Sequence, residues 1–141
     1  MEPKEPIDEP RRSKDRAIPD HGIVIEVDAR YVAENSSPRA RHWFFAYEIT
    51  IRNVGIVAAR LMTRHWLITD ANGKVEEVRG EGVVGETPHL NPGESFTYTS
   101  FCPLGTEFGS MRGSYEMIRP DGVTFEAEIP PFVLAVPTAI N

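Results

Sequence analysis

Short turn-forming motifs divide this 141-residue chain into brief segments, and they limit the folds that it can adopt. Twelve prolines and 11 glycines recur too often to favour long helices. Residues 70–74 contain an Asn-Gly pair, a strong hairpin signal because both residues tolerate positive φ. Similar combinations of Asn, Ser, Pro, Asp and Gly predict turns at residues 35–38, 53–55, 91–93 and 120–122. We therefore expect many short strands.

The segments between these turns alternate as half-buried strands do, with apolar side chains at every second position. In residues 22–31 one face consists of Ile23, Ile25, Val27, Ala29 and Tyr31. In residues 42–53 one face consists of Trp43, Phe45, Tyr47, Ile49 and Ile51. Aromatic and β-branched residues at this density suit a pleated sheet better than a helix. Further strands are expected at residues 59–70, 74–79, 94–101, 114–119, 123–129 and 132–136.

About eight short strands with frequent turns and no amphipathic helix predict an all-β fold, a two-sheet β-sandwich. The run from Leu90-Asn-Pro-Gly to Tyr98 is similar to the turn into the tyrosine corner of immunoglobulin-like sandwiches. The length suits one domain, which we expect over residues 22–137. Residues 1–21 are dense in charge and proline and have no apolar period, so they predict a flexible charged tail.

The charge balance argues against a nucleic acid or an anionic membrane as a partner. Fifteen Lys and Arg against 21 Asp and Glu give a net charge of −6. The basic cluster at residues 11–16 contains Asp15, and we interpret it as part of a solvated tail. The sequence shows neither the apolar stretch of a secretory signal nor a membrane span. Cys102 is the only cysteine, so we expect a cytoplasmic protein.

A glycine motif, G-x-G-x-x-G, occurs at Gly80, Gly82 and Gly85. In a dinucleotide-binding domain such glycines precede a helix, but two prolines in residues 86–93 forbid that helix here. Two interpretations remain open. The backbone N–H groups of Gly80, Glu81, Gly82, Val83, Val84 and Gly85 could form an anion site, with Arg79 and Arg64 supplying charge and Glu81 and Glu86 opposing it. Alternatively, the glycines let the chain cross between the sheets or pack against a neighbouring backbone.

The sequence does not contain a recognisable catalytic or metal-binding arrangement. The histidines, His21, His42, His65 and His89, lack the local spacing of metal ligands. The carboxylates of residues 76–86 are spread along a strand and a loop. Cys102 ends an apolar strand, where a buried, inert thiol is expected. We therefore predict a protein that is not an enzyme and has no cofactor and no metal site.

Several blocks of the sequence, taken in order, resemble the ApaG domain. They include Leu61-Met-Thr-Arg-His-Trp-Leu-Ile-Thr-Asp70 and Val78-Arg-Gly-Glu-Gly-Val-Val-Gly-Glu-Thr-Pro88, and the match runs from about Gly22 to Pro137. The resemblance implies a fibronectin type III-like sandwich, a stand-alone protein in bacteria and a module in some eukaryotic F-box and polymerase-interacting proteins. It also implies a link to diadenosine-tetraphosphate hydrolysis and to cobalt and magnesium efflux. The charged tail and the bulky Phe101-Cys102 pair depart from the family pattern.

These observations lead to two predictions of function. The first is a non-enzymatic ApaG-type binding module that mediates protein–protein interaction with an unidentified partner, through a sheet face or an exposed strand edge. The alternative is a binder of pyrophosphate, nucleotide or a divalent cation such as magnesium or cobalt. It would act through the loop of Gly80 to Gly85 and have an indirect role in cobalt and magnesium tolerance.

Overall fold

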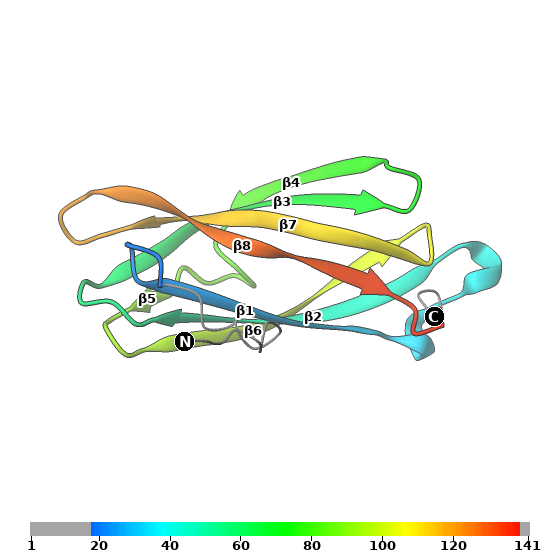
Figure 1. Cartoon of the computed structure of the whole chain (residues 1–141), viewed down its shortest axis with the longest axis horizontal. Helices are drawn as coiled ribbons and strands as arrows, with labels where there is room; N and C mark the ends of the chain where they lie inside the picture. The colour runs from blue at the N-terminus through cyan, green and yellow to red at the C-terminus, as the bar shows by residue number, and fades with distance from the viewer. Residues whose placement is uncertain (1–17, 139–141) are drawn as a thin grey trace, which may run out of the picture.

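The described residues, 18–138, form a two-layer β-sandwich in a computed structural model of the chain (Figure 1). The predicted all-β, two-sheet fold is confirmed. Most of the predicted tail, residues 1–17, lies outside the described residues. Within residues 18–138 there is no helix long and apolar enough to cross a membrane. The elements are β1 (Ile23–Tyr31), η1 (Ala33–Asn35), η2 (Pro38–Ala40), β2 (Trp43–Asn53), β3 (Ala59–Asp70), β4 (Val75–Glu81), β5 (His89–Leu90), β6 (Ser95–Leu104), β7 (Phe108–Ile118) and β8 (Thr124–Ala135).

The strands pair antiparallel in two sheets, with the order β1-β2-β6 in one and β4-β3-β7-β8 in the other. The short β5 adds to the second sheet by pairing with the start of β3. Strands β1 and β8, at the ends of their sheets, lie next to one another and close one side of the sandwich. The opposite side is therefore bounded by β4 and β6, which belong to different sheets. The chain between β4 and β5, which contains Gly82 and Gly85 of the glycine motif, leaves β4 on this open side.

The core forms where the alternating faces of the two sheets meet. On the predicted inner face of β2, Phe45, Ile49 and Ile51 are fully buried. Tyr47 packs edge-on against Trp66 of β3, with ring centroids 5.6 Å apart. Because every second residue of a strand points to the same side, the alternation seen in the sequence becomes one continuous core. The largest fully buried side chains are Phe45, Ile49, Ile51, Leu61, Met111, Tyr115, Met117, Ile129 and Leu134.

The last strand differs from the prediction of two strands at residues 123–129 and 132–136. It is continuous as β8 and runs through Pro130 and Pro131. Proline cannot donate a ladder hydrogen bond, but among the described strands β8 pairs only with β7, so N–H groups on its other side are not needed for pairing. The pairing register shifts between Met111 and Gly113, opposite these prolines. An edge position and a bulge thus accommodate two prolines that, in the sequence, predicted a break.

The hairpin between β3 and β4 also differs in detail from the prediction. Of the Asn-Gly pair only Gly73 has a positive φ, 85°. The carboxylate of Asp70 accepts hydrogen bonds from the N–H groups of Asn72, at 2.8 Å, and Lys74, at 3.0 Å. This side chain organises a longer loop in which one glycine supplies the left-handed residue.

Candidate functional site

Arg64 points toward the interior of the sandwich because of a bulge in β3. The register of β3 against β7 shifts between Leu61 and Thr63. Before the bulge, Ala59 and Leu61 are buried; after it, Trp66 is the buried residue. The inward positions therefore change from odd to even residue numbers, so that Arg64 shares the inner face with Trp66. Without this bulge the guanidinium would point to the outside of the sheet.

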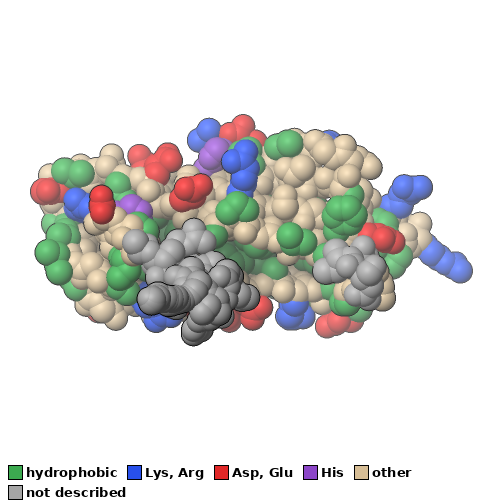
Figure 2. All heavy atoms as spheres, in the orientation of Figure 1, with side chains coloured by type: hydrophobic (Ala, Val, Ile, Leu, Met, Phe, Trp, Pro, Cys, Tyr) green, Lys and Arg blue, Asp and Glu red, His purple; other side chains and the backbone are tan. Residues whose placement is uncertain are grey.

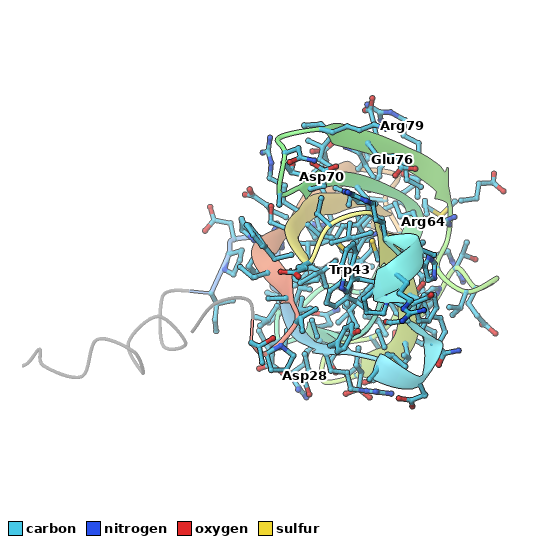
Figure 3. The ribbon with its side chains drawn as sticks, turned by 90° about the vertical axis from the view of Figure 1, so that its right-hand side faces the viewer. Asp28, Trp43, Arg64, Asp70, Glu76 and Arg79 are labelled. Carbon is cyan, nitrogen blue, oxygen red and sulfur yellow. The ribbon has the colours of Figure 1, made fainter. Side chains whose placement is uncertain are left out.

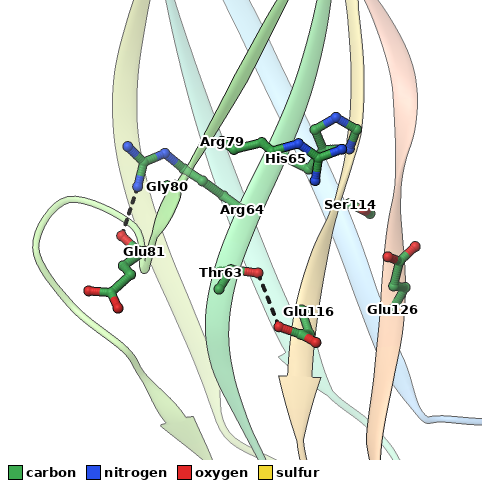
Figure 4. A pocket seen from close by; sticks show the side chains of 9 residues that line it. All are labelled: Thr63, Arg64, His65, Arg79, Gly80, Glu81, Ser114, Glu116 and Glu126. Atoms are coloured by element: carbon green, nitrogen blue, oxygen red, sulfur yellow. Dashed lines mark hydrogen bonds between the residues drawn. The ribbon is translucent and has the colours of Figure 1, made fainter.

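Gly80 lies directly opposite Arg64 in the β3–β4 ladder and leaves room for its guanidinium. A Cβ atom at Gly80 would lie 2.6 Å from Nη2 of Arg64. Nη1 of Arg64 donates hydrogen bonds to the carbonyl oxygens of Glu81, at 2.8 Å, and Gly82, at 2.9 Å. Figure 4 shows the bond to Glu81. The arginine therefore holds the loop through carbonyl groups, not through N–H groups.

The other two glycines of the motif, Gly82 and Gly85, adopt the backbone conformations that the following hairpin requires. Gly82 has φ 60°, and a Cβ atom there would collide with the carbonyl oxygen of Glu86. Val83 and Glu86 exchange backbone hydrogen bonds of 2.9 Å around a two-residue turn. In this turn Val84 has φ 43° and Gly85 has φ 82°, the signature of a type I′ turn. Each glycine of G-x-G-x-x-G thus has a local structural reason that involves no nucleotide.

The loop borders a polar hollow of about 360 Å³ on the open side of the sandwich. Tyr47 of β2 and Tyr98 and Ser100 of β6 line it from one sheet. Arg64 and the loop residues Glu81, Val83, Val84 and Gly85 line the rest. We call this hollow the edge pocket. It brings together seven of the eight predicted site residues, counting Gly80 and Gly82 through their contacts with Arg64, and adds three that the sequence did not predict.

The predicted residues belong to the edge pocket in two ways. Arg64, Glu81, Val83, Val84 and Gly85 line it directly. Gly80 and Gly82 contact Arg64 by backbone packing and by a carbonyl hydrogen bond, respectively. Seven of the eight residues are therefore part of one arrangement. Only Arg79 lies apart from it.

The hydroxyl groups of the edge pocket stay neutral at physiological pH. Burial raises the pKa of Tyr47 and of Tyr98 above the ordinary tyrosine value. Tyr98 forms a hydrogen bond with the hydroxyl of the fully buried Tyr115, whose pKa burial also raises. The charge of Arg64 lowers the pKa of all three tyrosines slightly, by a smaller amount than burial raises it. The pocket therefore offers neutral hydroxyls and the cation of Arg64, with Glu81 at its border.

Arg79 lies on the outer face of the sheet, away from the guanidinium of Arg64. Its ladder partner is His65, one position on from the pair of Arg64 and Gly80. Arg79 forms an ion pair of 3.0 Å with Glu77, which also lies 2.6 Å from Nε2 of His65. These contacts hold the pKa of Glu77 below its ordinary value, with the His65 hydrogen bond the larger cause. Figures 3 and 4 show the two arginines pointing in different directions.

A shallow hollow of about 420 Å³ lies over this outer face. Thr63, His65 and Arg79 border it together with Ser114, Glu116 and Glu126, and Arg64 reaches its rim (Figure 4). Within residues 18–138 no group of three or more His, Cys, Asp or Glu side chains could hold a metal ion. The carboxylates of this face are spread over three strands. The arrangement therefore gives a divalent-cation site no support.

Cys102 is buried, as the sequence predicted. Burial raises the pKa of its thiol to about 11, so the thiolate that a nucleophile needs is scarce at neutral pH. Its sulfur contacts the carbonyl oxygen of Pro103 at 3.7 Å. This geometry describes a core residue and not a catalytic one.

The sequence did not predict three residues of the edge pocket as site residues: Tyr47, Tyr98 and Ser100. Their alternation placed them on inner faces, which is a signal of burial and not of a site. They line a pocket because β2 pairs with β6 and because no described strand lies on the other side of β6. Neither pairing is visible in local sequence.

Sequence comparison places this architecture in a family. A family model described as the ApaG domain matches residues 33–119. The chain belongs to the ApaG family. It is 53% identical over 121 residues to Protein ApaG of Pseudomonas paraeruginosa, covering 86% of this chain and 96% of that one. It is 56% identical over 119 residues to Protein ApaG of Azoarcus sp., covering 84% and 94%.

Solved structures agree with the fold. The putative ApaA protein of Bordetella pertussis superposes with a TM-score of 0.80 at 48% sequence identity, covering 82% of this chain and 94% of that one. The names of these relatives state no catalytic activity. The fold of an ApaG protein therefore has direct structural support, and the function has to be argued from the site.

Proposed function

We propose that this ApaG chain is a protein-interaction module that binds an extended segment of a partner along the free edge of β6. The observation that carries the proposal is the composition of that edge. From Ser95 to Leu104 the strand contains no charged residue, in a chain of which 26% is charged. A long uncharged edge strand attracts another strand, and proteins usually blunt such edges.

The other three sheet edges carry charged side chains, which β6 lacks. Charges or prolines occur along each of them, and β1 and β8 also face one another. Figure 2 shows charged side chains scattered over the face on which β8 lies. The features are Glu26, Asp28 and Arg30 in β1; Glu76, Glu77, Arg79 and Glu81 in β4; and Glu126, Glu128, Pro130 and Pro131 in β8.

The ladder hydrogen bonds show which backbone groups of β6 are free. The N–H of Val54 donates to Gly22 and that of Asn53 donates to Glu94, so even residues of β2 bond toward β1 and odd residues toward β6. In β6 the even residues thus bond to β2. The N–H and C=O groups of Thr97, Thr99 and Phe101 point outward, and within the described chain no backbone partner meets them.

Pro103 takes the next outward position of β6. A proline has no N–H to offer, and within sheets it is tolerated where the N–H side faces solvent. Its presence there agrees with the assignment of outward groups. It also ends the free edge, which therefore runs from Ser95 to Phe101.

Side chains on both sides of this edge could contact an added strand. On the inner side Tyr98 and Ser100 open into the edge pocket. On the outer side Phe101 is 54% exposed and stacks on Phe44, with ring centroids 5.4 Å apart. In strand addition, backbone hydrogen bonds supply affinity and pockets for alternate side chains supply specificity. The β6 edge has both.

A peptide selection tests this proposal. Random linear peptides selected on the purified protein are expected to perturb the amide signals of residues 95–101 in heteronuclear NMR spectra. Thr99→Pro removes one outward N–H without touching the ladder to β2, and we expect about tenfold weaker binding. Thr99→Ala keeps that N–H and is the matched control. Peptides that bind both variants equally, or that perturb other strands only, would contradict the proposal.

A second candidate function is binding of pyrophosphate or a nucleotide in the edge pocket. Arg64 favours it, together with the N–H groups of Val84 and Gly85, which make no backbone hydrogen bond to another described residue. Calorimetric titration with pyrophosphate tests this candidate. The affinity of Arg64→Met is compared with that of Arg79→Met, a control that removes a cation from the outer face. If binding is weaker than about millimolar, or if both variants behave alike, this candidate fails.

A further inference from the structure

Arg64 is a partly buried cation for which the described residues provide no counter-charge. Within residues 18–138 only Arg52 and Arg79 have a carboxylate within 3.3 Å. Of the other arginines there, only Arg64 and Arg119 are partly buried, and the guanidinium of Arg119 lies over the ring of Phe125. Glu81 borders the same pocket, but Figure 4 shows its carboxylate turned away from the guanidinium. An arginine that is removed from water usually has an anionic partner.

The guanidinium also has hydrogen-bond donors that no described residue uses. It carries five N–H donors. Two of them, both on Nη1, are used by the carbonyl groups of Glu81 and Gly82. Nε and Nη2 make no hydrogen bond to any described residue, which leaves three donors. A planar arginine fork with adjacent free donors matches a carboxylate, which can accept two bonds side by side.

An added strand at the β6 edge would bring alternate side chains to this fork. Partner residues opposite Tyr98 and Ser100 would point to the inner side, as those two residues do. Both line the edge pocket with Arg64. The hydroxyl groups of the pocket are neutral and the carboxylate of Glu81 is turned away from the guanidinium, so Arg64 is the charged group that an inserted side chain would meet.

We infer that the segment bound along β6 inserts an aspartate or glutamate side chain into the edge pocket, where its carboxylate pairs with Arg64. The inference rests on the proposed function and specifies the partner as an extended segment with an acidic residue at an inward position. Gly80 is then a positioning residue. It has no side chain, and this allows the guanidinium to lie over the β4 backbone and face the pocket.

The selected peptides test the inference in a double-mutant cycle. We expect the selection to enrich one acidic position, and Asp→Asn there to weaken binding to the unmodified protein about 10- to 100-fold. On Arg64→Met the same peptide change is expected to have no further effect, because the charge that it pairs with is gone. Arg79→Met is the matched control and should keep the full difference between the two peptides.

Gly80→Ala separates loss of charge from loss of fold. The added methyl group meets the mobile end of Arg64 and not backbone, so the protein should fold with its guanidinium displaced. We expect this variant to lose the preference for Asp over Asn while circular dichroism and the melting temperature remain close to those of the unmodified protein. A persistent preference in folded Gly80→Ala and Arg64→Met would overturn the inference.

The outcomes distinguish this inference from the proposed function. The selected peptides could bind the β6 edge, lose binding in Thr99→Pro and show no preference for an acidic residue. That result would support strand addition and overturn the role of Arg64. A failure to select any edge-binding peptide would overturn both. The last measurement uses free pyrophosphate. The inference would be overturned if pyrophosphate binds, if its binding is lost in Arg64→Met but unchanged in Thr99→Pro, and if the peptide does not compete with it. That result would assign the pocket to small anions.

Discussion

At the scale of single residues, the loop of Gly80 to Gly85 contains an unusual backbone conformation. Val84 occupies the left-handed region, with φ 43°, although it is β-branched. Its Cβ substituents crowd the backbone there, and left-handed backbone costs an L-residue about 1–2 kcal/mol. Strain of this kind is common at binding sites, where the surrounding structure maintains it. Val84 also lines the edge pocket.

The first prediction follows from this strain. Val84→Asn should raise the free energy of unfolding by about 1 kcal/mol, because asparagine tolerates the left-handed region. Urea denaturation measures the change. Val75→Asn is the matched control, since both valines are 56% exposed but Val75 does not have a positive φ. An equal effect in the two variants would show that Val84 is unstrained.

At the scale of elements, one buried polar side chain joins three segments of the fold. Asn53, at the end of β2, is fully buried. Its Nδ2 donates to the carbonyl oxygens of Val57 and Leu90, both at 2.9 Å, and its Oδ1 accepts from the N–H of Gly55, also at 2.9 Å. The side chain thus ties the β2–β3 connection to β5, which ends the loop that starts at the glycine motif.

Removing this side chain should be costly. Asn53→Ala would leave three backbone groups without their partner, and we expect a loss of about 2–3 kcal/mol in the free energy of unfolding. Denaturant titration monitored by tryptophan fluorescence would measure it. Asn72→Ala, at an exposed position in the β3–β4 hairpin, should change stability by less than about 0.5 kcal/mol. Comparable losses in both variants would refute the role of Asn53.

At the scale of the whole molecule, the sandwich has a closed side and an open side. On the closed side the ring of His21 stacks on Phe125 of β8 at 4.9 Å, and the guanidinium of Arg119 lies 5.1 Å from the same ring. Nδ1 of His21 accepts a hydrogen bond of 3.1 Å from the N–H of Ile23, so it is unprotonated in this arrangement. These contacts join the start of β1 to the other sheet.

This arrangement makes stability depend on pH. Burial, and then the charge of Arg119, lower the pKa of His21 below 6.5. The unfolded chain therefore binds the proton more readily, so His21 contributes fully above about pH 6.5 and its contribution falls as the pH drops through the folded-state value. As the pH is lowered from about 6.5, the melting temperature of His21→Phe should fall less than that of the unmodified protein. Parallel curves for the two proteins would rule out His21 as the source.

Much of the fold was predictable from local sequence, and for clear reasons. Alternation identified the inner faces of β1 and β2, because side-chain direction in a strand depends only on residue parity. The hairpin between β3 and β4 was predicted as well, although its backbone differs in detail. A type I′ turn formed instead at Val84 and Gly85, where no standard signal is present. There, pairing of Val83 with Glu86 imposed the turn on an unsuitable residue.

The candidate site shows the limit of such prediction. The sequence by itself determined the alternating strands, the turns and the glycine motif, since each follows from the chemistry of neighbouring residues. Only the tertiary structure decided that the β3 bulge turns Arg64 inward while Arg79 stays outside, and that β6 has a free edge above the edge pocket. Strand register and the choice of edge strands depend on contacts between distant segments, which local patterns do not encode.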